Sequence, residues 1–189
     1  MDHARRHPGA VVALWQDEVS FYRHPTQGQL WSWAGRKQPH LPWSHRSNTL
    51  VRVTGVLDAV SGENLTRQAS KISVECLLKF YQQVLDHYPQ ALLIYLIQDN
   101  WPNHKHEKVQ TFLAAHPRLQ VLFLPTYAPW LNPIEKLWRW VRQTLGHAHP
   151  YSDDFTKFKA QLQSCLAEAT HKAVDMLRYC GVTNSKIYT

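Results

Sequence analysis

The hydrophobic pattern of this chain changes its period near residue 70. Before that point, residues 11–18 and 49–60 are rich in the apolar and β-branched side chains that favour strands. After it, apolar residues between Ser73 and His87 recur at helical spacing, and Ser73 is a suitable N-cap. Antiparallel strands followed by helix-linked strands are typical of a layered α/β fold with a mixed sheet.

The same patterns predict the remaining elements. Residues 20–22 continue the first strand, and residues 30–34 form a partner beyond a turn at 25–28. Residues 36–47 are a polar excursion without regular structure. Further strands are predicted at 91–98 and 119–124, and further helices at 107–115, 133–145 and 154–169. This order predicts a ribonuclease-H-like α/β fold, with a mixed five-stranded sheet flanked by helices.

Composition limits the class of protein. The 189 residues, 44% of them hydrophobic, suit a single globular domain over residues 1–189. Apolar runs are too short for a membrane span, and residues 1–8 lack the apolar segment of a signal peptide, so we expect a cytoplasmic protein. The formal net charge of +7 favours a polyanionic partner such as DNA. Three widely spaced cysteines and histidine pairs two residues apart indicate neither disulfides nor a zinc site.

Asp99 is the first candidate site residue. It follows the apolar run 91–97, at the carboxyl end of a predicted central strand, where α/β sheets place their sites. A structural Asp-Asn turn with Asn100 is the alternative. The next residues include His104 and Lys105, which are donors suited to phosphate.

Glu135 is the second candidate, in the first turn of the helix predicted at 133–145. One alternative is a capping box with Asn132 as the N-cap. The apolar stripe predicted to pack on the sheet consists of Ile134, Trp138, Val141 and Leu145. Glu135, Arg139 and Arg142 form a second stripe, which suits either a metal ligand flanked by phosphate contacts or a solvated face.

Asp17 and Glu18 end the first apolar run and must point to opposite faces of a strand, so only one can join a shared site. The spacing does not choose between them. Two loop tryptophans, Trp101 and Trp130, lie beside the candidate acids, where they either stack on bases or wall the site. Two carboxylates at strand ends and a third on a later helix are what a two-metal phosphoryl-transfer site needs, so we predict an enzyme that cuts and joins DNA.

Three motifs together resemble the DDE transposases of the mariner superfamily, especially the bacterial insertion-sequence branch. They are WQDE at 15–18, LIQDN at 96–100 with His104 five residues after Asp99, and LPTYAPWLNPIEKLW at 124–138. The third is highly specific, and the spacing from Asp99 to Glu135 is close to the family pattern. The resemblance runs from about Val11 to Leu145.

The resemblance implies a ribonuclease-H-like catalytic domain with Asp17, Asp99 and Glu135 as metal-binding acids. Two Mg²⁺ ions, replaceable by Mn²⁺, would support cleavage at transposon ends and strand transfer to target DNA. Asn100 and His104 match further family positions. With Lys105, Arg139 and Arg142, they are the predicted DNA-binding residues. Transposases of this kind work as dimers on paired ends, so a homodimer is expected, nucleoid-associated in a bacterium when bound to DNA.

The chain departs from the family pattern at its start. Family members carry an N-terminal helix-turn-helix region that recognises transposon ends, whereas here the first strand is predicted about ten residues in. We therefore expect this region to be absent, or to be encoded separately as a partner. Two alternative functions remain: a regulatory or DNA-binding remnant without catalysis, and a ribonuclease-H-like nuclease that hydrolyses without strand transfer.

Overall fold

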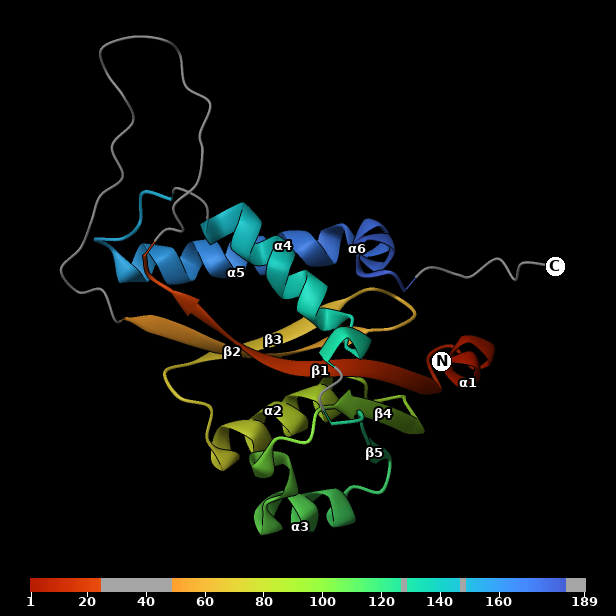
Figure 1. Ribbon diagram of the computed structural model, residues 1–189. Helices are drawn as coiled ribbons and strands as arrows, with labels where there is room; N and C mark the ends of the chain where they lie inside the picture. Colours follow the sequence, from red (N-terminus) through yellow and green to blue (C-terminus); the bar gives the residue numbers. More distant parts are fainter. Residues whose placement is uncertain (25–48, 127–128, 147–148, 183–189) are drawn as a thin grey trace, which may run out of the picture.

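A mixed sheet forms the centre of the computed structural model, which describes residues 1–24, 49–126, 129–146 and 149–182. Its five strands lie in the order β3-β2-β1-β4-β5 (Figure 1). They are β1 (Val11–Tyr22), β2 (Leu50–Asp58), β3 (Asn64–Ala69), β4 (Leu93–Gln98) and β5 (Leu119–Phe123). The pairs β1–β2 and β2–β3 are antiparallel, and the pairs β1–β4 and β4–β5 are parallel. The predicted ribonuclease-H-like mixed sheet is thereby confirmed.

Helices cover both faces of this sheet (Figure 1). One face carries α2 (Val74–His87) and α3 (Glu107–Ala115), and the other carries α4 (Ile134–Gly146), α5 (Phe155–His171) and α6 (Ala173–Cys180). The short α1 (Asp2–Arg6) packs against β1, and two 3-10 turns, η1 (Pro102–Lys105) and η2 (Pro129–Leu131), precede α3 and α4. Within the described residues, no helix is both long and apolar enough to span a membrane.

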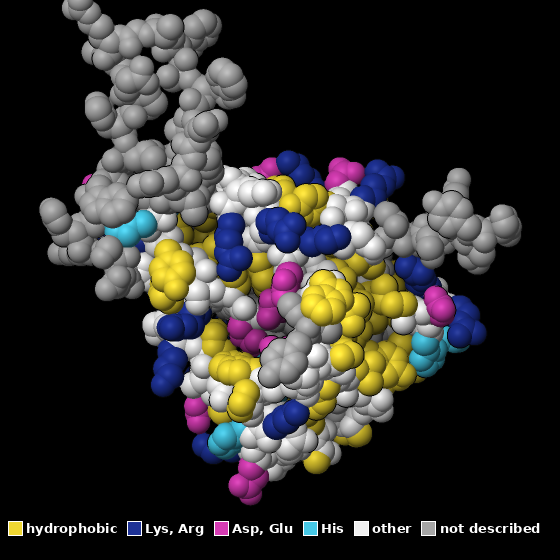
Figure 2. Space-filling model, viewed as in Figure 1, with side chains coloured by type: hydrophobic (Ala, Val, Ile, Leu, Met, Phe, Trp, Pro, Cys, Tyr) yellow, Lys and Arg dark blue, Asp and Glu magenta, His cyan; other side chains and the backbone are white. Residues whose placement is uncertain are grey.

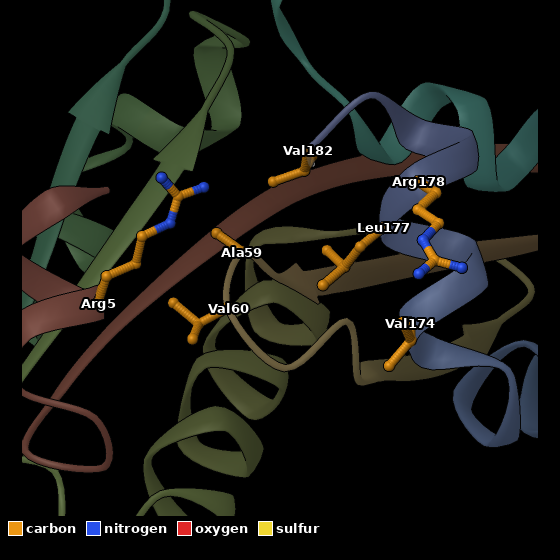
Figure 3. A pocket seen from close by; sticks show the side chains of 7 residues that line it. All are labelled: Arg5, Ala59, Val60, Val174, Leu177, Arg178 and Val182. Carbon is orange, nitrogen blue, oxygen red and sulfur yellow. The ribbon is translucent and has the colours of Figure 1, made fainter. Parts of the chain in front are cut away.

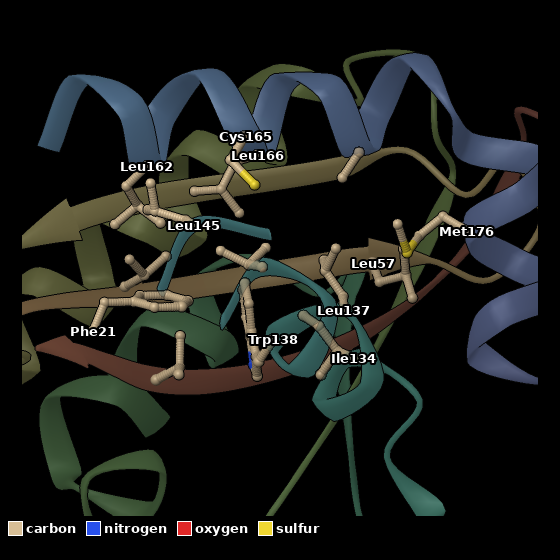
Figure 4. Packing of buried hydrophobic residues seen from close by; sticks show 14 of the residues in the cluster. Phe21, Leu57, Ile134, Leu137, Trp138, Leu145, Leu162, Cys165, Leu166 and Met176 are labelled. Atoms are coloured by element: carbon tan, nitrogen blue, oxygen red, sulfur yellow. The ribbon is translucent and has the colours of Figure 1, made fainter. Parts of the chain in front are cut away.

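The core between α4 and the sheet follows the predicted apolar stripe. Ile134, Trp138, Val141 and Leu145 are all buried there. They pack with Phe21 of β1, Leu57 of β2 and residues of α5 and α6 (Figure 4). Each large apolar side chain taken from water contributes about 1.5–3 kcal/mol, so this cluster fixes the start of α4 against β1.

The core on the opposite face joins the two central parallel strands to α2. Leu14 of β1 and Leu96 of β4 are paired in register and fully buried, under Phe80 and Val84 of α2. Successive side chains of β1 therefore point to opposite faces of the sheet and pack into different cores. For the same reason, the side chains of Asp17 and Glu18 lie on opposite faces of the sheet.

One strand and two helices of the structure, β3, α1 and α6, were not predicted from the sequence. The predicted strand at 30–34, its turn at 25–28 and the excursion at 36–47 lie outside the described residues. The third strand of the antiparallel set is β3, at 64–69, which was not predicted because all six of its residues are half-buried and show no apolar alternation. The short helices α1 and α6 were also not predicted. The helix at 107–115 agrees residue for residue with its prediction.

Candidate active site

Two of the predicted acids lie side by side on the central parallel strands. The register of β1 and β4 pairs Trp15 with Ile97. Two residues beyond this pair in each strand direction, Asp17 of β1 is level with Asp99, which directly follows the end of β4. The carboxyl ends of parallel strands are where such sheets place polar sites.

Asp17 points toward α4 and is held by a tryptophan. The indole Nε1 of Trp138 donates a hydrogen bond to Asp17 Oδ2 at 3.0 Å. Gly55, the β2 residue paired with Asp17, makes room for the indole, since a Cβ there would stand 2.7 Å from Trp138 Cη2. Burial, and then the negative charges of Glu18 and Glu135, raise the pKa of Asp17 to about 7. Ionisation of this carboxyl is therefore costly, first because it is buried and then because two acids lie near it.

Glu135 reaches the same region from the first turn of α4. The turn is tied to β1 because Asn132 Nδ2 donates to the backbone oxygen of Gln16 at 2.9 Å. The Oδ1 of Asn132 accepts no hydrogen bond among the described residues, so this side chain does not cap the helix. Within the described residues, Glu135 makes no side-chain hydrogen bond or ion pair, so the capping-box alternative is wrong. Desolvation raises the pKa of Glu135 against the opposing charges of Arg139 and Arg142.

A buried histidine connects Asp99 to Glu18 on the other face of β1. His104 is fully buried, with Nδ1 3.2 Å from Asp99 Oδ1 and Nε2 3.2 Å from Glu18 Oε1. Glu18 Oε1 also accepts a hydrogen bond from Gln16 Nε2 at 2.6 Å. Asp99 is turned outward, with 57% of its side chain exposed, and its Oδ1 also accepts from Trp101 N at 2.9 Å.

The charge on His104 decides what this network does. Burial alone lowers its pKa, but the hydrogen bonds to Asp99 and Glu18 outweigh burial and raise the pKa to about 9. At neutral pH the ring is an imidazolium that donates to both carboxylates. In return, the bond from His104 lowers the pKa of Asp99, which stays ionised.

The other predicted DNA-binding residues lie around these acids. Asn100 Nδ2 donates to Leu124 O at 2.6 Å, which joins the ends of β4 and β5. Exposed Lys105 has its Nζ 5.2 Å from the ring centre of Phe123. Arg139 and Arg142 are exposed on α4. Figure 2 shows acidic side chains gathered near the middle of this face, beside a row of lysine and arginine side chains. The structure thus gives His104 and Asn100 internal partners and leaves three cations available at the surface.

Whether this donor set suits a metal ion depends on its chemistry. Among the described residues, no three Asp, Glu, His or Cys side chains are close enough together to form a metal site as they stand. The three predicted ligands are all carboxylates, the oxygen donors that Mg²⁺ prefers. Burial, and then the negative charges of Glu18 and Glu135, raise the pKa of Asp17, and a bound cation would stabilise its ionised form. The residues therefore fit a divalent ion.

Several residues that build the site were not singled out from the sequence. Gln16 and Thr54 are buried polar side chains that hydrogen-bond to each other at 3.2 Å beside Glu18, and Gly55 admits the indole of Trp138. A glutamine in an apolar run and a glycine inside a predicted strand were the available signals. Trp138 was assigned to the core, and the bond from its Nε1 to Asp17 is visible only in three dimensions.

Comparison with known proteins gives matches in sequence and in structure. The family model described as DDE superfamily endonuclease matches residues 12–159. The Insertion element IS630 uncharacterized 39 kDa protein of Shigella sonnei is 26% identical over 139 residues, covering 74% of this chain and 40% of that protein. The chain thus spans about two fifths of the length of this relative.

Solved structures share the fold at low sequence identity. The Mos1 transposase paired-end complex with left transposon end matches with a TM-score of 0.58 at 14% identity, over 100% of this chain and 60% of that one. The catalytic core domain of BIV integrase matches with a TM-score of 0.51 at 13% identity, over 85% of this chain and 82% of that one. These likenesses establish the architecture of the sheet and its helices.

Proposed function

The chain belongs to the DDE superfamily endonucleases, and from this membership we propose that it is the catalytic domain of a DNA transposase. Its reaction is metal-dependent cleavage of DNA strands at transposon ends, followed by transfer of the freed 3′ end to target DNA. Asp17, Asp99 and Glu135 are the proposed metal-binding and catalytic acids.

The observation that supports this proposal is that Asp17 and Asp99 lie on adjacent parallel strands and that the start of α4, which carries Glu135, is docked on β1. The parallel register brings Asp17 level with Asp99, and the bond from Asn132 to Gln16 fixes the start of α4 beside them. The negative charge of Glu135 contributes to the raised pKa of Asp17, so the two carboxyls are electrostatically coupled. Acids on two adjacent strands and one helix support a single shared site.

The proposed cofactor is a pair of Mg²⁺ ions held by these three carboxylates, with Mn²⁺ able to replace them. Bound divalent ions would polarise the scissile phosphate and lower the pKa of the attacking water or hydroxyl. The protein itself orients the ligands: Trp138 holds Asp17, and His104 holds Asp99. The solved Mos1 mariner paired-end complex with Mn is a structural neighbour, which supports a divalent ion.

The proposed partner is DNA, both transposon ends and target. The net charge of +7 and the exposed cations Lys105, Arg139 and Arg142 beside the acids suit a phosphate backbone. Asn100 and His104 belong to the same proposed surface but act from inside, by fixing the loop after β4. Neighbouring structures include a Mos1 strand transfer complex, which supports DNA as the partner. From the resemblance of the sequence motifs to the family, we propose that the domain works on DNA as a homodimer.

Nicking of supercoiled plasmid in Mg²⁺ or Mn²⁺ tests the proposal. Wild type should nick, and Asp99→Asn and Glu135→Gln should each lower the rate by at least about 100-fold, because a metal supplies several kcal/mol of charge stabilisation. Asp86→Asn is the matched control, since Asp86 is an exposed acid of α2 that bonds only Gln82 among the described residues.

Two results would contradict the assignment. Equal nicking by wild type and both site variants would remove these acids from the reaction. Binding of DNA by the wild type without nicking in either metal would indicate a DNA-binding or regulatory module instead of an enzyme.

A further inference from the structure

Gln16 is a fully buried amide at the centre of the candidate active site. It lies in β1 directly before Asp17, so its side chain points to the opposite face of the sheet, the face covered by α2. A side chain with no exposed surface cannot touch DNA or a metal ion. Any part that Gln16 plays in the reaction must therefore pass through the residues that it contacts.

The amide of Gln16 holds the carboxylate of Glu18. Its Nε2 lies 2.6 Å from Glu18 Oε1 and 3.2 Å from Thr54 Oγ1. Thr54 is paired with Glu18 in the register of β1 and β2, and its hydroxyl donates to the same Oε1 at 3.5 Å. Two neutral donors of the sheet thus fix the position of one carboxylate oxygen.

The contacts continue from Glu18 to Asp99. His104 lies between the two acids, with each ring nitrogen 3.2 Å from a carboxylate oxygen. The Trp101 ring meets His104 edge-on, with ring centres 5.4 Å apart, so Trp101 walls the site as one of its two interpretations held. The backbone N–H of Trp101 also donates to Asp99 Oδ1 at 2.9 Å. Both donors engage the same oxygen of Asp99, which leaves Oδ2 for a metal ion.

The backbone of Gln16 fixes the element that carries the third acid. Asn132 Nδ2 donates to the Gln16 backbone oxygen at 2.9 Å, at the start of α4, and Glu135 lies in the first turn of that helix. Asp17 is the next residue of β1. One residue thereby connects the chain segments that carry all three proposed metal ligands.

A glutamine is costly at this position. Its Oε1 is buried and has no hydrogen-bond partner among the described residues. Neighbouring side chains on the same face of the sheet include Leu14 and Leu96, both fully buried. An unsatisfied buried acceptor lowers stability, and an apolar side chain of similar volume would avoid that loss. The advantage of a glutamine here therefore comes from its Nε2, which holds Glu18.

We propose that Gln16 is a positioning residue of the active site, which acts through Glu18 and His104 to orient Asp99 for metal binding. This inference rests on the proposed function, because it assumes that Asp99 is a metal ligand. Residues that orient a ligand without touching the metal typically change metal affinity by about 10- to 100-fold. Since Gln16 acts through two intermediate residues, we expect the lower end of this range.

The cavity shown in Figure 3 is not part of this arrangement. It holds about 260 Å³, and Arg5 and Arg178 stand on opposite sides of an aliphatic lining that includes Val60 and Leu177. Both arginines have acidic neighbours on their own helices. Neither Gln16 nor any of its hydrogen-bond partners lines this cavity, so it gives no second route from Gln16 to the reaction.

Binding of Mn²⁺, followed by the electron paramagnetic resonance signal of the free ion, tests the inference apart from catalysis. Gln16→Met keeps a similar volume but removes the donor, so it should weaken Mn²⁺ binding by about 10-fold. Tyr81→Phe is the matched control, because its hydroxyl is equally buried under the same face but bonds Gln98 instead of Glu18. This control should bind Mn²⁺ as wild type does, and urea unfolding of both variants separates lost stability from lost metal affinity.

A double-mutant cycle tests the route through Glu18. Glu18→Ala should weaken Mn²⁺ binding by about 10- to 100-fold, and adding Gln16→Met should cause no further loss. Losses that multiply in the double variant would overturn the proposed route. If Gln16→Met does not fold, Thr54→Val decides, because it keeps the side-chain shape and removes the other neutral donor to Glu18. Unchanged Mn²⁺ affinity in Thr54→Val would then overturn the inference.

The outcomes separate this inference from the proposed function. Equal Mn²⁺ affinity of Gln16→Met and wild type, with binding still lost in Asp99→Asn, would overturn the role of Gln16 and leave the transposase assignment intact. Equal weakening by Gln16→Met and Tyr81→Phe would also overturn that role, because any lost buried hydrogen bond would then have the same effect. A wild type that neither binds Mn²⁺ nor nicks DNA would overturn both proposals.

Discussion

Replacing His104 with glutamine should remove a buried cation that joins two acids at the site. The ring is fully buried between Glu18 and Asp99, with both nitrogens 3.2 Å from a carboxylate oxygen. Its pKa rises from 6.5 to about 9. Since each pH unit between the unfolded and folded pKa is worth about 1.4 kcal/mol, the protonated ring stabilises the fold by about 3 kcal/mol. Loss of one partner from a buried ion pair commonly lowers stability by about 3–5 kcal/mol, which agrees with this value.

The sign of the shift defines a pH window. The folded protein holds the His104 proton more tightly than the unfolded chain does, so the stabilisation is complete below about pH 6.5. It is lost as the pH rises through about 9. We therefore expect His104→Gln to be about 3 kcal/mol less stable than wild type at pH 6, with the difference shrinking toward pH 9.

Urea unfolding of both proteins at pH 6, 7.5 and 9 measures this difference. His87→Gln is the matched control, because His87 also faces a glutamate, Glu63, at 3.1 Å, but both side chains are more than a third exposed. Exposed pairs contribute about 0–1 kcal/mol, so this variant should differ little from wild type at any pH. A difference between His104→Gln and wild type that is the same at pH 6 and pH 9 would refute the buried imidazolium.

Three further predictions concern Asp17 and the DNA surface. Gly55→Ala should lower stability by about 1–3 kcal/mol, or roughly 2–12 °C in Tm, because the new Cβ would meet the Trp138 ring at 2.7 Å; an unchanged Tm would contradict this. The pKa of Asp17 near 7 means that metal binding should strengthen as the pH rises from 6 to 8 and should release protons, measurable by calorimetry in buffers of different ionisation enthalpy. Without proton release at pH 6.5, Asp17 would not be a ligand. Arg139→Gln and Arg142→Gln should each reduce the salt slope of DNA affinity by about 1, and an unaltered slope would remove that residue from the phosphate contacts.

The sequence was sufficient to predict the elements that have strong hydrophobic periodicity. The helix at 107–115 and the buried stripe of α4 were predicted correctly because apolar side chains recur at the spacing that burial demands. The strand β3 was missed because an edge strand that is half-buried along its whole length needs no alternation. The helix α6 was missed because it is short and its N-cap, Lys172, makes no side-chain capping bond.

The candidate site was predictable in its residue types and less so in its contacts. Asp99 and Glu135 follow a strand and begin a helix, and both positions are visible in the sequence. The alternative in which the side chain of Asn132 caps α4 is wrong, because its Nδ2 bonds the backbone of Gln16 and its Oδ1 accepts no hydrogen bond among the described residues. Hydrogen bonds between residues more than a hundred positions apart depend on how α4 docks on β1, and local propensity carries no information about that docking.

The adjacent acids Asp17 and Glu18 show how electrostatics can choose where spacing does not. Glu18 faces a buried imidazolium and accepts further hydrogen bonds, so its charge is already compensated inside the protein. Asp17 is buried, its donors are the neutral Trp138 Nε1 and the backbone N–H of Glu18, and two acids are its neighbours, so ionisation is costly and its pKa rises to about 7. A divalent cation binds most favourably where a negative charge has no positive partner in the protein. Asp99 shares the His104 imidazolium with Glu18 and differs from it in exposure, because 57% of its side chain is exposed and His104 and Trp101 engage only its Oδ1 among the described contacts. The charge balance of the fold therefore favours Asp17 over Glu18 as the metal ligand, with Glu18 acting through His104 to hold Asp99 in place.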